Sequence, residues 1–125
     1  MAANAYAACI DACNACANAC DRCAAACLEE DDVQAMARCI ALDTDCAALC
    51  RLAAGMMARE SEFAPSACAL CAELCEACSG ECESHDAEHC KACAAACRRC
   101  ADECQRMAPE GYGARGREGS ARHAH

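Results

Sequence analysis

Cysteine recurs along this chain at alternating intervals of three and four residues, and alanine fills many of the positions between. Each interval matches the a and d positions of a heptad, which share one face of an α-helix. We therefore predict four helices, over residues 4–28, 32–59, 66–83 and 86–108. The four runs are Cys9, Cys13, Cys16, Cys20, Cys23 and Cys27; Cys39, Cys46 and Cys50; Cys68, Cys71, Cys75, Cys78 and Cys82; and Cys90, Cys93, Cys97, Cys100 and Cys104.

The predicted helix boundaries carry ordinary capping signals. Asp31 and Asp32 precede the second helix, where a carboxylate can accept from free backbone N–H groups. Pro65 opens the third helix, Ser84 can cap the fourth, and Pro109 follows its end. Short connections force neighbouring helices to run antiparallel. The expected fold is all-α, an antiparallel up-down-up-down four-helix bundle with a cysteine-lined core.

The length of 125 residues suits one small domain. We expect a four-helix metal-storage domain over 1–108 and a disordered, Gly- and Arg-rich tail over 109–125. The chain has 35 Ala, 19 Cys, one Phe and no Trp. A conventional core of large aliphatic and aromatic side chains is excluded, so sulfur must fill the interior.

The net charge of −9 argues against a nucleic-acid partner, because phosphate binding needs a basic face. No apolar run approaches the length of a membrane span, and no export signal precedes Arg22, so we expect a cytoplasmic protein. His85-Asp86-Ala87-Glu88-His89 matches the H-x-x-E-H pattern of some zinc peptidases. The motif sits at a helix start without a cleft or scaffold for catalysis, and we expect no enzymatic activity.

Two readings of so many cysteines are a disulfide framework and a metal store. The odd count, the absent export signal and the helical spacing all oppose disulfides. Thiols at i and i+4 point the same way, which is a poor start for the torsion of a disulfide, and only bridges between facing helices stay open as an alternative. Nineteen inward thiols would instead make a continuous sulfur lining able to hold many soft ions.

Soft thiolate ligands select Cu(I), Zn(II) or iron–sulfur clusters. Zinc requires closed sets of four ligands, and iron–sulfur sites use a few cysteines at loop spacings. Cu(I) accepts two or three bridging thiolates and neutralises one negative charge per ion, so multiple Cu(I) ions per chain fit the lining best. A thiol-based redox protein and a zinc or mixed soft-metal store remain the alternatives.

The departures from the cysteine pattern mark further candidate ligands. Asp43 falls at a seam position between Cys39 and Cys46. It is either a boundary residue facing solvent or an oxygen acceptor that binds transient copper or a proton inside the bundle.

The two ends of the bundle differ in their predicted chemistry. One end carries side chains that can bind a metal, namely histidines, a methionine and carboxylates. We predict that copper enters there through His85, His89 and Met36. Bulky and thioether side chains close the opposite end, which is the alternative entrance. The first end brings together Glu30, Asp32, Met36, His85, Asp86 and His89, and the second Tyr6, Met57 and Met107.

The cysteine runs HCKACAAACRRCADEC (89–104) and CIDACNACANACDRCAAAC (9–27) resemble those of the bacterial copper storage proteins, in the branch without an export signal. The resemblance covers residues 4–108. It implies a four-helix bundle that stores many Cu(I) ions along its core and assembles as a homotetramer. In that branch histidines lie at the bundle mouth, which matches His85 and His89.

Overall fold

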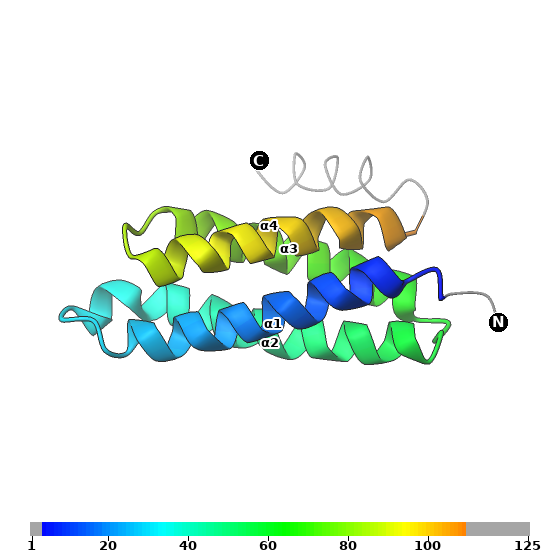
Figure 1. Cartoon of the computed structure of the whole chain (residues 1–125), viewed down its shortest axis with the longest axis horizontal. Helices are drawn as coiled ribbons and strands as arrows, with labels where there is room; N and C mark the ends of the chain where they lie inside the picture. Colours follow the sequence, from blue (N-terminus) through cyan, green and yellow to red (C-terminus); the bar gives the residue numbers. More distant parts are fainter. Residues whose placement is uncertain (1–3, 110–125) are drawn as a thin grey trace, which may run out of the picture.

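The computed structural model describes residues 4–109, which form four long helices and one short turn of 3₁₀ helix. The helices lie side by side along the long axis of the molecule (Figure 1). Their bounds fall within a few residues of those predicted from the cysteine spacing. The elements are α1 (Ala7–Cys27), η1 (Val33–Met36), α2 (Ala37–Ala58), α3 (Ala64–Glu83) and α4 (Glu88–Met107).

Each long helix packs against two others, in the cyclic order α1, α2, α3, α4. The α1–α2 and α3–α4 connections lie at one end of the bundle, on the left of Figure 1, and the α2–α3 connection lies at the other. The predicted antiparallel four-helix bundle is therefore confirmed. Apart from Pro109, the tail predicted over 109–125 lies outside the described residues.

The helix ends follow most of the predicted signals. The Asp32 carboxylate accepts a hydrogen bond from the Ala35 amide at 3.2 Å, so it caps η1, which precedes α2. Pro65 lies in the first turn of α3, where its missing N–H costs nothing. The prediction that Ser84 caps α4 is wrong. Its hydroxyl donates to the Glu81 carbonyl at 2.6 Å, and the residue ends α3 instead.

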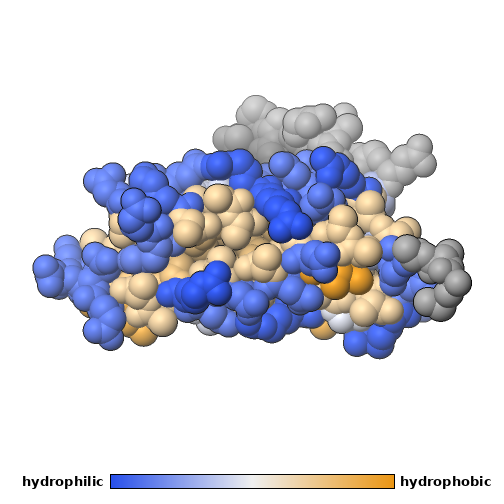
Figure 2. Space-filling model, viewed as in Figure 1, coloured by the Kyte–Doolittle hydropathy of each residue, from blue (hydrophilic) through white to orange (hydrophobic). Residues whose placement is uncertain are grey.

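The core consists almost entirely of cysteine and alanine. All nineteen cysteines are buried, Cys9 at 1% exposure and the others at 0%. Small side chains let the helices approach closely, and alanine gives each helix a high intrinsic propensity. The surface alternates charged side chains with weakly hydrophobic ones (Figure 2). None of the helices between residues 4 and 109 combines the length and the hydropathy needed to cross a membrane.

Candidate metal centre

The nineteen thiols line the bundle axis, where the Asp43 carboxyl group joins the thiols of one end, through Cys39 and Cys82, to the rest of the column, through Cys78 and Cys93. All are free thiols, and neighbouring Sγ atoms lie 3.5 to 3.9 Å apart. The contacts run both along one helix, as from Cys16 to Cys20 at 3.9 Å, and between helices, as from Cys16 to Cys97 at 3.6 Å. This spacing exceeds a disulfide bond of about 2.05 Å but lets two sulfurs bond to one ion between them.

Several sets of four thiols are close enough to surround an ion, with all four sulfurs within 4.8 Å of one another. The sets overlap, because Cys16 and Cys46 belong to two of them and Cys20 and Cys97 likewise to two. Shared thiols are suited to bridging between adjacent ions. Five of the sets are Cys13, Cys71, Cys100 and Cys104; Cys16, Cys46, Cys50 and Cys75; Cys16, Cys20, Cys46 and Cys97; Cys20, Cys78, Cys93 and Cys97; and Cys23, Cys27, Cys39 and Cys90.

Burial raises the pKa of the Cys27 and Cys39 thiols and so keeps them protonated when no metal is bound. Desolvation, followed by the charge of nearby Cys90, raises the pKa of Cys27 to about 11. Desolvation and the neighbouring Asp43 carboxylate also raise the pKa of Cys39. A soft cation that binds here must displace these protons, because the thiolate is the metal ligand.

Asp43 lies inside the sulfur column with 0% exposure, so its reading as a boundary residue facing solvent is wrong. Its Oδ1 accepts hydrogen bonds from the thiols of Cys78 and Cys93, both at 3.2 Å, and Cys82, at 3.6 Å. Its Oδ2 accepts from Cys39 at 3.7 Å. Burial raises the pKa of Asp43 to about 9, so the carboxyl group holds a proton near neutral pH.

His89 connects the sulfur column to the outside. Its Nδ1 lies 3.5 Å from the Cys90 sulfur and 3.6 Å from the Cys23 sulfur, while its Nε2 lies 2.9 Å from the Glu30 carboxylate. When Nε2–H donates to Glu30, the Nδ1 lone pair faces the thiols. A carboxylate on the outer ring nitrogen commonly orients histidines that bind metals.

The other predicted mouth residues take different positions. His85 does not face a thiol; its Nε2 lies 2.9 Å from the Glu81 carboxylate, which also pairs with Arg38 at 3.2 Å. Met36 is buried at 6% exposure and packs within the core cluster. Asp32 and Asp86 are exposed.

The opposite end of the column is covered. Met57 is fully buried there, and the half-buried side chains of Tyr6 and Met107 pack against the core. The predicted contrast between a polar end and a bulky end is therefore present, and the described residues present histidine to the thiols only at the polar end.

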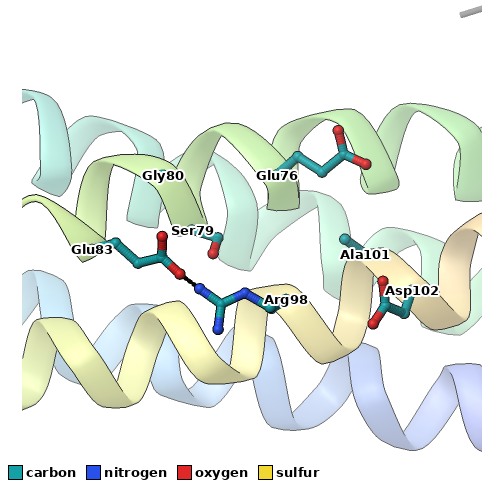
Figure 3. A pocket seen from close by; sticks show the side chains of 7 residues that line it. All are labelled: Glu76, Ser79, Gly80, Glu83, Arg98, Ala101 and Asp102. Atoms are coloured by element: carbon teal, nitrogen blue, oxygen red, sulfur yellow. Dashed lines mark ion pairs between the residues drawn. The ribbon is translucent and has the colours of Figure 1, made fainter. Parts of the chain in front are cut away.

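A surface hollow of about 210 Å³ lies between α3 and α4 but does not belong to the column (Figure 3). Its lining includes Glu76, Asp102 and the ion pair between Glu83 and Arg98, and it contains no cysteine. Ser79, which also lines the hollow, donates to the Ala94 carbonyl at 3.3 Å, and this bond satisfies its hydroxyl group. The hollow offers no soft ligands.

Each histidine at the polar end pairs with a carboxylate, and neither pairing was predicted from the sequence. Glu30 lies in the α1–α2 connection, and it meets His89 of α4 across the bundle end. Glu81 lies four residues before His85, and that i, i+4 spacing on a helix end was a usable signal. The cysteine register placed Glu30 and His89 at the same end of the bundle, but their hydrogen bond is set only by the fold.

Comparison with known proteins places the chain among cysteine-rich bundles that hold copper. The structure superposes on Cu(I)-bound copper storage protein BsCsp3 with a TM-score of 0.80 at 48% identity, covering 83% of this chain and 98% of that one. A cytosolic copper storage protein from Streptomyces lividans, loaded with five coppers, gives a TM-score of 0.78 at 40% identity, covering 81% and 89% of the two chains.

A curated relative is the uncharacterized cysteine-rich protein YhjQ of Bacillus subtilis, which is 50% identical over 67 residues. That match covers 54% of this chain and 62% of the relative, so it spans less than two thirds of the relative's length. The family model described as copper storage protein matches residues 2–109. The match spans all four helices and every cysteine of the column, and the chain belongs to the copper storage protein family.

Proposed function

We propose that this chain stores and sequesters many Cu(I) ions in the cytosol, as thiolate complexes along the core of the domain spanning residues 1–108. The observation that carries the proposal is the core lining of nineteen free, buried thiols, most of which lie 3.5 to 3.9 Å from another thiol. It is a binding function without turnover. The relatives described as copper storage proteins, one of them cytosolic, support it.

The sharing of thiols favours Cu(I) over zinc. Separate tetrahedral zinc sites need four unshared thiolates each, whereas the four-thiol sets here have members in common. Each Cu⁺ offsets the charge of one thiolate, so a filled column has little net charge in the buried core. We propose that all nineteen cysteines serve as ligands, with Asp43 receiving copper in transit.

Copper enters, in this proposal, at the end where the α1–α2 and α3–α4 connections meet. His89 receives the ion on Nδ1 and passes it to Cys23, Cys27 or Cys90, whose sulfurs lie 3.5 to 3.9 Å from that nitrogen. Met36 and His85 lie at the same end and complete its set of candidate ligands.

We propose that four copies of the chain assemble into a homotetramer, as the resemblance to the family implies. The outer face of α2 supports association of copies. Leu42, Leu49 and Met56 are half-buried there, and Leu52 is 55% exposed. Leu70 on α3 is also exposed, at 54%.

An anaerobic Cu(I) titration against a competing chelator tests the storage function. We expect tight uptake of many equivalents, approaching one ion per thiol, with release of about one proton per ion because protonated thiols must become thiolates. Uptake of only one or two equivalents would overturn the proposal. The same titration with Zn(II) tests the alternative store, and retention of free thiols after mild oxidation argues against a redox role.

Replacing His89 with Leu is expected to slow Cu(I) uptake several-fold while leaving the final capacity almost unchanged. The thiols that hold the ions remain, and only the ligand between them and solvent is lost. His85→Leu is the comparison variant: the ring of this second candidate ligand contacts Glu81 and does not lie against the thiols, so its loss is expected to slow uptake less. Stopped-flow uptake from a Cu(I) donor measures both rates. Equal slowing in the two variants would remove His89 from this role.

A further inference from the structure

Met57 occupies an inward-facing position that continues the cysteine pattern of α2. The cysteines of α1 follow steps of four, three, four, three and four residues. Because α2 is packed against the same axis, the same steps taken from Cys39 identify its inward-facing positions. These positions are Cys39, Asp43, Cys46, Cys50, Ala53 and Met57, and all six are buried.

The thioether of Met57 lies in the sulfur column rather than beside it. The Met57 side chain is 0% exposed, and the Cys68 thiol donates to its Sδ at 3.5 Å. Cys68 is the first cysteine of α3, and it lies at the closed end of the column. The distance equals the shortest thiol–thiol contacts of the column, such as Cys9 to Cys104 at 3.5 Å.

The backbone around Met57 is held in place. Glu60 adopts a left-handed conformation (φ 54°) at the end of α2. In this turn the Glu60 N–H donates to the Met57 carbonyl at 3.0 Å, and the Ser61 N–H donates to the Met56 carbonyl at 2.9 Å. The Asn4 side-chain amide also donates to the Met57 carbonyl, at 3.2 Å. The backbone at Met57 is therefore fixed, and full burial confines the side chain that it carries.

We infer that the Met57 thioether is a Cu(I) ligand, which together with the Cys68 thiolate holds the ion at the closed end of the column. Thioethers are soft ligands suited to Cu(I), and two sulfurs 3.5 Å apart can both bond to one ion at about 2.3 Å. The pair of one thiolate and one neutral thioether also matches the single charge of Cu⁺. This inference rests on the proposed storage function and adds a ligand of a second chemical type to it.

Selenium absorption spectroscopy of selenomethionine-labelled, fully Cu(I)-loaded protein tests the inference. Met36→Leu is introduced throughout, so that a methionine at the mouth contributes no signal. Met57→Leu is compared with Met56→Leu, the adjacent methionine, which is half-buried on the outer side of the core. We expect copper at bonding distance from selenium in the Met56→Leu protein and loss of that copper neighbour in the Met57→Leu protein.

The outcomes separate this inference from the storage function. A full copper load with no copper neighbour on selenium, or a selenium–copper signal that survives Met57→Leu, would overturn the assignment of Met57 and leave storage intact. Failure of the Met36→Leu protein and the unsubstituted chain alike to take up more than two equivalents would overturn both. The measurement on the Met36→Leu protein alone already decides whether any methionine outside the mouth binds copper, should Met57→Leu not fold.

Discussion

The metal-free, reduced protein is expected to become less stable as the pH rises from about 4 to about 9, and Asp43→Asn is expected to remove most of that dependence. Burial raises the pKa of Asp43 from 3.8 to about 9. Between these two pKa values the folded chain holds a proton that the unfolded chain has released. The free energy of unfolding is therefore highest below the unfolded pKa, and it falls as the pH rises until the folded pKa is reached. The slope from one such group is about 1.4 kcal/mol per pH unit.

Urea unfolding in chelator and reductant, between about pH 5 and pH 8, measures the effect below the range in which free thiols ionise. Asparagine retains an oxygen that accepts from the surrounding thiols of Cys39, Cys78, Cys82 and Cys93, and it cannot ionise. Asp45→Asn is the control, since Asp45 is an exposed acid on the same helix. Parallel pH dependence in the Asp43→Asn and unsubstituted proteins would show that Asp43 ionises equally in the folded and unfolded states.

Replacing Cys16 and Cys97 together with serine is expected to remove more than two Cu(I) equivalents. Each of these thiols belongs to two four-thiol sets in the middle of the column, and their sulfurs lie 3.6 Å apart. Loss of a bridging thiolate deprives the ions on both sides of a ligand, and the hard hydroxyl of serine does not replace it.

The matched control removes the same number of thiols at the closed end, as Cys9→Ser with Cys68→Ser. Cys9 lies 3.5 Å from Cys104, and Cys68 lies 3.5 Å from Met57, so at that end fewer thiols lie this close to each cysteine than in the middle of the column. The end pair is expected to cost about two equivalents, because its ions have few neighbours to disturb. Anaerobic titration of both double variants, with helicity checked by circular dichroism, makes the comparison. Equal losses would mean that the thiols bind copper independently.

The helices and their inward faces were predictable because both depend on short-range spacing. Steps of three and four residues place side chains on one face of a helix, and this does not depend on the rest of the chain. The match to the copper storage protein family covers all four cysteine runs. The helix bounds were predicted to within a few residues for the same reason. Ser84 was misassigned because a serine between two helices can end one or begin the next, and only the backbone path decides.

The roles of the polar side chains near the axis were not predictable in the same way. The spacing put Asp43 on the seam, but whether it faced water or sulfur depended on how far α3 and α4 close over α2. Similarly, the sequence predicted His85 and His89 equally as copper ligands. Only the packing at this end of the bundle directs the Nδ1 of His89 toward the thiols.

The sequence by itself determined that this chain makes four amphipathic helices whose apolar faces are cysteine, and therefore that soft metal binding is its chemistry. Local periodicity and composition carry that information, since helix geometry repeats without reference to other segments. Only the tertiary structure decided which thiols meet across helices, that Asp43 and Met57 belong to the same column, and that Glu30 orients His89. Those contacts join residues far apart in the chain, and their distances are set by the rotation and depth at which one helix packs against the next.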